Sequence, residues 1–335
     1  EMLGAGGNTY EYARQYAFCV IVFGGIPTVL SNVLSNLIRS IGKSKEAGAG
    51  IILGGILNIA LDPLFMFVLL PDGYEVLGAG AATALSNCIA CLFFLAVLIR
   101  LGRASVITFS PKTGLAERES MAAVFAVGIP SAVATFLFDL DYVVIDKLMV
   151  SYHDLALAAI GIVLKVERFP LNVGIGICQG MLPLVAYNYG AGNKKRMDDT
   201  IRLARGVGIV IALVSILLYE IFAGQFVRIF ISDAQTIAMA SRFLRIRVLA
   251  TPLMFLSFFT VYLFQAFGKG KISLFLGVTR WLVFNIPMLF ILNGIFGMYG
   301  IVWSQVTADM LTVILSFYVF FRFRPRMEDE RGVGK

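Results

Sequence analysis

"AGAGIILGGILNIALDPLFMFVLL", residues 47–70, gives the clearest indication of the fold class. Apart from Asn58 and Asp62 it consists of apolar residues, glycine and one proline. A helix that crosses the hydrocarbon core of a bilayer needs roughly 20 apolar residues, and this run is long enough. It therefore predicts a membrane-spanning helix that carries an amide and a carboxylate at membrane depth.

The rest of the chain has the same character. It has 335 residues, of which 59% are hydrophobic, with a mean hydropathy of +0.84, whereas soluble domains are about 45–50% apolar. The runs are continuous, unlike the alternating segments of about ten residues that form β-barrels. We therefore expect an all-α integral membrane protein, a polytopic helical bundle. Nine spanning helices are predicted, at 17–38, 47–70, 77–99, 121–146, 155–187, 206–231, 246–267, 272–292 and 297–321.

The net charge of +7 fits a membrane topology better than a surface for nucleic acid. If alternate connections are cytoplasmic, that side carries 19 of the 28 Lys and Arg residues. The opposite side carries six, including Arg242, Arg245 and Arg247, which fit the positive-inside rule poorly. We expect these three either at the head-group level or lining a cavity.

Two parts of the chain resemble each other. "PTVLSNVLSNLIRSIGKSK" (27–45) and "PLMFLSFFTVYLFQAFGKGK" (252–271) both open on proline, run through an apolar helix and close on Gly-Lys-x-Lys. Residues 12–100 thus match residues 240–322, three helices each. Duplicated halves are a recurrent plan in transporters. We expect a three-helix remainder of an N-lobe (1–100), a basic inter-lobe loop (101–118), a six-helix C-lobe (119–322) and a cytoplasmic tail (323–335), in a protein whose first three helices are absent here.

Five segments, in the right order, resemble the multidrug and toxic compound extrusion (MATE) transporters. They are "LGAGGNTYEYARQY" (3–16), "LNIALDPLFMF" (57–67), "GAGAATALS" (78–86), "QGMLPLVAYNYGAGNKKRM" (179–197) and "FGMYGIVWSQVTADML" (296–311). The resemblance covers nearly the whole chain. It implies a fold of twelve helices in two six-helix lobes, of which this chain would supply helices four to twelve.

Asn58 and Asp62 are candidates for binding a small cation. They lie one helical turn apart and share a face, and Pro63 provides no N–H for the carbonyl of Ile59. Such oxygens suit Na⁺, and a buried carboxylate alone suits H⁺. Alternatively, Asp62 caps a broken helix or bonds a neighbour. The resemblance implies that Asn58, Asp62 and Thr83 are involved in cation coupling; it also implies a partner carboxylate on a first helix.

A second polar cluster is predicted in the second half. Asp139 and Asp141 lie on one helix, Lys165, Glu167 and Arg168 on the next, and Asp139 and Lys165 lie at similar depths. These five residues either line an acidic cavity for lipophilic cations or form a static salt-bridge network. The depths of Arg280 and Asp309 also match, which predicts a structural ion pair.

These features indicate an antiporter that exports organic, cationic amphipathic compounds in exchange for H⁺ or Na⁺. The alternative is a flippase for lipid-linked saccharides. An enzyme is not expected, since the sequence has no GxxxxGK[ST] or HExxH motif and one histidine, His153. We expect no cofactor, no metal other than Na⁺ at Asp62 and Asn58, no nucleic acid partner, contact with membrane lipid, a monomer when complete, and a multi-pass location in the plasma or inner membrane.

Overall fold

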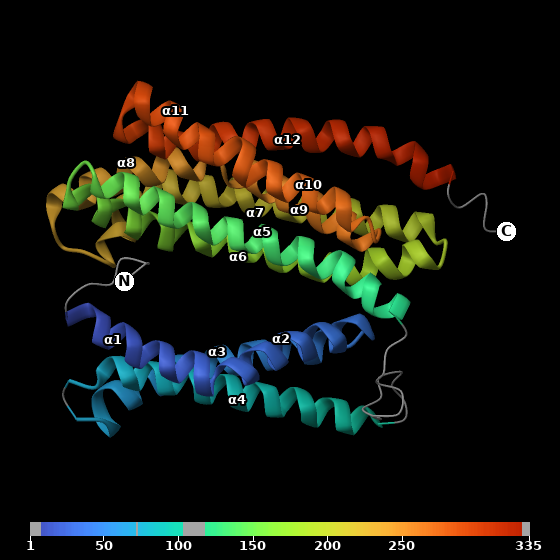
Figure 1. Ribbon diagram of the computed structural model, residues 1–335, viewed down its shortest axis with the longest axis horizontal. Helices are drawn as coiled ribbons and strands as arrows, with labels where there is room; N and C mark the ends of the chain where they lie inside the picture. Colours follow the sequence, from blue (N-terminus) through green and yellow to red (C-terminus); the bar gives the residue numbers. More distant parts are fainter. Residues whose placement is uncertain (1–7, 72, 103–117, 330–335) are drawn as a thin grey trace. The chain divides into compact units, whose positions relative to one another are not determined.

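The computed structural model describes residues 8–71, 73–102 and 118–329, in which every regular element is a helix. The chain divides into two compact units, Glu1–Leu115 and Ala116–Lys335 (Figure 1, blue to cyan and green to red). The boundary falls within the predicted basic loop at 101–118. Most of that loop, 103–117, lies outside the described residues, as does the end of the predicted tail, 330–335.

The first unit contains four α-helices and two short π-helical segments. They are α1 (Asn8–Ala17), η1 (Phe18–Phe23), α2 (Gly25–Ser40), α3 (Ser44–Leu64), η2 (Phe65–Leu69) and α4 (Glu75–Leu101). Both α2 and α3 pack on α4 around a core that includes Leu34, Ala47 and Phe94.

The second unit contains eight α-helices and one π-helical segment. They are α5 (Arg118–Val150), α6 (Asp154–Gly190), α7 (Lys194–Arg228), α8 (Ala234–Val248), α9 (Thr251–Ala266), α10 (Gly270–Val278), η4 (Thr279–Asn285), α11 (Ile286–Phe296) and α12 (Met298–Asp329). One apolar core joins α5, α6, α7, α8, α11 and α12, and another joins α6, α7, α9, α10 and α12.

Two pairs of helices are bent at positions where the sequence predicts single spans. The segments Tyr10–Phe23 and Gly25–Ser40 meet at 52°, and Ala234–Val248 and Thr251–Ala266 meet at 46°. In each pair a proline, Pro27 or Pro252, stands in the first turn of the second helix, where its missing N–H is tolerated. The predicted span at 246–267 therefore begins earlier, at Ala234, and is broken near Leu249.

Seven helices of the described chain are long and apolar enough to cross a bilayer, and the count rises to nine if each bent pair is one span. Their outer faces are apolar: Ile59 on α3 and Phe136 on α5 are 74% and 67% exposed. In water such faces would be unstable, whereas in a bilayer they contact acyl chains.

The repeat seen in the sequence recurs in the local structure. Gly42 and Gly268 follow α2 and α9 with φ values of +83° and +69°, a backbone conformation that favours glycine. In both places the next residue, Lys43 or Lys269, donates its N–H to a carbonyl five residues back. Each bent pair therefore ends on the same tight turn.

Candidate functional site

The predicted residues Asn58, Asp62 and Thr83 come together in the first unit. The Nδ2 atom of Asn58 lies 3.1 Å from Oδ1 of Asp62 and 3.3 Å from Oγ1 of Thr83, and donates to both. Thr83 in turn donates its hydroxyl to the carbonyl of Ala79 at 2.9 Å. All three side chains are half-buried between α3 and α4, so two helices hold this group of oxygens together.

Pro63 explains why α3 changes its winding just beyond this group. It lies inside α3 one residue after Asp62 and supplies no N–H to the carbonyl of Ile59. The helix continues to Leu64 and then adopts the wider π-helical winding of η2, which often marks functional positions. Asp62 thus lies at the end of the regular part of α3.

Asp62 lacks a basic partner among the described residues. The ion pairs of the first unit join Glu11 to Arg14 and Glu46 to Lys43, and neither involves Asp62. No described group of three or more His, Cys, Asp or Glu residues is placed to hold a metal ion. One carboxylate with a neighbouring amide and hydroxyl is suited instead to a proton or a monovalent cation.

The second unit contains a buried network of charged side chains. Glu167 on α6 binds Arg247 on α8 through two hydrogen bonds, from Nε at 2.7 Å and from Nη2 at 2.8 Å. Arg280 on η4 and Asp309 on α12 form an ion pair with Nη2 and Oδ1 2.8 Å apart. The sequence predicted this second pair correctly, but it left the partner of Glu167 unidentified.

Asp141 on α5 is the fifth charge of this network. It is 2% exposed, and its Oδ1 atom has no hydrogen-bond partner among the described residues. The charges of Arg247 and Arg280 attract it, and those of Asp309 and Glu167 repel it. The network therefore contains three acids and two arginines and has one negative charge in excess when all are ionised.

The structure places only part of the predicted cluster in this buried network. Asp139, Lys165 and Arg168 are exposed in the second unit, and no ion pair joins Asp139 to Lys165 among the described residues. Arg168 instead places its guanidinium 4.8 Å from the ring centroid of Tyr142. Only Asp141 and Glu167 of the five predicted residues belong to the buried network.

Sequence reasoning did not include Arg247 or Gln305 in this cluster, although it named lining a cavity as one of two alternatives for Arg247, and Arg247 lines the cavity described below. Arg247 is 3% exposed, which explains why it fitted poorly among the outer basic residues: it lies inside the bundle. Gln305 donates its Nε2 to Oδ2 of Asp309 at 2.6 Å. Its position four residues before Asp309, one helical turn away, was the signal in the sequence.

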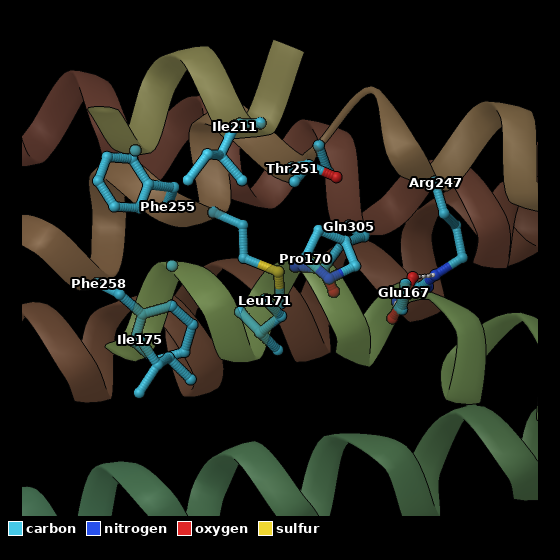
Figure 2. Close-up of a pocket in the computed structure, with 15 residues that line it drawn as sticks. Glu167, Pro170, Leu171, Ile175, Ile211, Arg247, Thr251, Phe255, Phe258 and Gln305 are labelled. Carbon is cyan, nitrogen blue, oxygen red and sulfur yellow. Dashed lines mark hydrogen bonds and ion pairs between the residues drawn. The ribbon is translucent and has the colours of Figure 1, made fainter. Parts of the chain in front are cut away.

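A cavity adjoins the network between α6, α7, α8, α9 and α12. Figure 2 shows Glu167 and Arg247 joined at one end of it and Ile175, Phe255 and Phe258 at the other. Its volume is about 20 Å³, enough for about one water molecule. Phe255 fits there because Gly174 and Gly208 present no side chain to its ring.

The chain is similar to known proteins over nearly its whole length. It is 30% identical, over 334 residues, to the multidrug export protein MepA of Staphylococcus saprophyticus, which covers 99% of this chain and 72% of that protein. The MepA protein of Staphylococcus haemolyticus is also 30% identical, over 332 residues, with 99% and 72% covered. The chain belongs to the MATE family. The MatE family model itself matches residues 130–291.

Solved structures of MATE proteins share this fold. An outward-facing multidrug resistance MATE transporter of the MOP superfamily superposes with a TM-score of 0.87 at 23% identity, covering 99% of this chain and 73% of that one. A Vibrio cholerae MATE transporter, VcmN, gives 0.84 at 18% identity, with 97% and 72% covered. Together with the bilayer-length helices, this confirms the predicted all-α, multi-pass membrane fold.

Proposed function

We propose that this MATE protein is a secondary antiporter that exports organic, cationic amphipathic compounds in exchange for H⁺ or Na⁺. The observation that carries the proposal is the group formed by Asn58, Asp62 and Thr83, in which the carboxylate has hydrogen bonds but no described basic partner. The relatives named above are multidrug export proteins, which supports the same kind of cargo here.

The coupling follows from the energetics of a carboxylate in a membrane span. An ionised acid at membrane depth costs at least about 2.5 kcal/mol. A proton removes that charge, and a Na⁺ ion held by the oxygens of Asp62 and Asn58 compensates it. Because the empty and occupied states of Asp62 differ in charge, they favour different packing of α3 against α4. A cation that binds one conformation better than the other shifts their populations.

The charged network of the second unit supports a cationic cargo. Its three acids exceed its two arginines by one, so an added positive charge is favourable there and an added anion is not. A flippase for lipid-linked saccharides would instead need an excess of basic groups for the pyrophosphate. We therefore favour the antiporter over the flippase.

The remaining expectations belong to the same proposal. The ion gradient supplies the energy, so that no organic cofactor is needed. The protein functions in the plasma or inner membrane, with lipid around its apolar faces and no nucleic acid partner. The complete protein acts as a monomer.

Proteoliposomes test the proposal. The purified protein is reconstituted with ethidium inside, and a pH or Na⁺ gradient is imposed across the membrane. We expect ethidium efflux that depends on one of these gradients and stops when an ionophore dissipates it. Efflux that depends on neither gradient, or that requires ATP, would contradict the proposal.

A further inference from the structure

The guanidinium of Arg280 lies in a site of unusual composition. Its Cζ atom is 4.4 Å from the ring centroid of Phe258 and 4.4 Å from that of Trp281. On a third side, Asp309 provides a carboxylate oxygen at 2.8 Å. Aromatic faces combined with a negative charge are what proteins use to bind organic cations. Arg280, Trp281 and Asp309 are at most 3% exposed, so the site is closed around its own side chain.

Two residues of the cavity in Figure 2 also contact this site. Phe258 lines the cavity and also forms one wall around Arg280. Gln305 lines the cavity as well and donates a hydrogen bond to Asp309. A molecule that entered from the cavity would therefore meet Phe258 and Gln305 first and Asp309 next. A cavity of about 20 Å³ is too small for such a molecule, so Phe258 has to move when one enters.

Arg280 has an alternative partner if it leaves Asp309. Asp141 is attracted by Arg280. Within the part of the chain that the structure describes, neither Oδ1 of Asp141 nor Nε of Arg280 has a hydrogen-bond partner. A buried charge that loses its partner costs about 3–5 kcal/mol, and a second carboxylate, that of Asp141, would offset part of this cost for Arg280.

We propose that Phe258, Trp281 and Asp309 form a binding site for the charged head of an organic cation, and that Arg280 is its resident occupant. The incoming cation displaces the guanidinium from Asp309, and Arg280 then pairs with Asp141. This proposal rests on the cationic cargo of the proposed function and adds the residues that recognise it. With the cation bound, three acids face three positive charges, so the excess negative charge of the network is neutralised.

The first experiment removes the resident guanidinium. Methylguanidinium and tetramethylammonium are titrated against the purified full chain in detergent, and binding is measured by calorimetry for wild type and Arg280→Ala. A tethered side chain competes at an effective concentration in the millimolar range or above. We therefore expect Arg280→Ala to bind both cations at least about tenfold more tightly than wild type, and Asp309→Asn added to it to cancel the gain.

Arg247→Ala is the matched control. Arg247 is equally buried and also paired with a carboxylate, but it makes no cation–π contact among the described residues. Its removal leaves no aromatic site, so we expect no gain for tetramethylammonium. Equal gains in Arg280→Ala and Arg247→Ala, or no gain in either, would overturn the proposal.

A second measurement leaves Arg280 in place, in case Arg280→Ala does not fold. The chain has two tryptophans, Trp281 and Trp303, so Trp303→Phe leaves Trp281 as the only one. We expect tetraphenylphosphonium to change the emission of Trp281 saturably, and Asp309→Asn to abolish the change. If the emission stays constant while the protein still exports ethidium, this site is refuted and the proposed antiport is not. If tetraphenylphosphonium binds saturably but no gradient-driven export occurs, the site is supported and the proposed antiport is refuted.

Discussion

Glu167 and Arg247, 80 positions apart in the chain, form a two-pronged ion pair between α6 and α8, with contacts of 2.7 and 2.8 Å. The two side chains are 11% and 1% exposed. Their mutual attraction compensates for burial only while both are present. This pair connects α6 to the first helix of the bent pair α8–α9, next to the bend.

Removing one member of this pair is therefore expected to destabilise the protein strongly. We predict that Arg247→Met lowers the free energy of unfolding by about 3–5 kcal/mol, because Glu167 keeps its charge in a buried place. The double variant Glu167→Leu with Arg247→Met should recover most of that loss. Denaturation of the purified protein in detergent measures both.

Arg245→Met is the control for this prediction. Arg245 lies 3.8 Å from Glu220 with half its side chain exposed, so its loss should cost less than about 1 kcal/mol. Equal losses of stability in Arg245→Met and Arg247→Met would show that the buried pair contributes no more to stability than the exposed one.

Asp141 and Asp139 provide a test of which acid attracts cargo. Asp141 is buried and attracted by the charges of Arg247 and Arg280, whereas Asp139 is exposed on another side of α5. We predict that Asp141→Asn weakens binding of a cationic dye by about tenfold, or ~1.4 kcal/mol, because the network loses its excess negative charge. Asp139→Asn should bind the dye as wild type does. Equilibrium binding followed by fluorescence anisotropy compares them, and the opposite order would argue against the network as the cargo site.

The close approach of Phe255 to Gly208 gives a third prediction. A Cβ atom at Gly208 would overlap the Phe255 ring, whereas a Cβ at Gly206, two residues earlier on α7, meets nothing within 4 Å. We expect Gly208→Ala to cost about 1–3 kcal/mol of stability and Gly206→Ala to gain up to about 1 kcal/mol. Parallel thermal denaturation of the two variants checks this, and a Gly208→Ala protein as stable as Gly206→Ala would contradict the packing.

Asp233, which precedes α8 outside the spanning segments, provides the pH-dependent prediction. Its Oδ2 accepts hydrogen bonds from the backbone N–H of Thr236 at 2.8 Å and from the Thr236 hydroxyl at 2.7 Å. The backbone hydrogen bond, followed by the hydroxyl bond, lowers the pKa of the Asp233 carboxyl below its usual value of about 3.9.

Because the folded pKa of Asp233 is depressed, its contribution to stability is present above the unfolded pKa and is lost as the pH falls through the folded pKa. Asp233→Ala should therefore be less stable than wild type at neutral pH, and the difference should shrink toward pH 3. Melting temperatures at several pH values measure this. A difference in melting temperature that grows as the pH falls would be inconsistent with stabilisation by the hydrogen bonds between Asp233 and Thr236.

The sequence predicted most of the fold, because hydropathy alone locates segments long enough to cross a bilayer. It did not predict the bends before Pro27 and Pro252, since a proline in the first turn of a helix is compatible with either a straight or a broken span. The i,i+4 spacing predicted that Asn58 and Asp62 share a face, and their side chains are in contact. Thr83, which also contacts Asn58, was implied by the family resemblance, because spacing along the chain does not fix contacts between neighbouring helices.

The second cluster was harder to predict for a geometric reason. Residues two apart on a helix do not share a face, so Asp139 and Asp141 cannot both point into the bundle. The same holds for Lys165 and Glu167. Depth along the helices suggested that Asp139 pairs with Lys165, but rotation about the helix axis excludes it. Arg247 lies on a helix distant in sequence, so only tertiary packing identifies it as the partner of Glu167.

In the proposed mechanism, occupancy of Asp62 by a small cation drives export. Gradient-driven ethidium efflux from proteoliposomes containing Asp62→Asn tests this, with Asp139→Asn as the matched control. We predict that Asp62→Asn loses the response to an imposed pH or Na⁺ gradient by at least about tenfold while it still binds ethidium, and that Asp139→Asn responds as wild type does. An Asp62→Asn protein that responds to the gradient as strongly as wild type would contradict it.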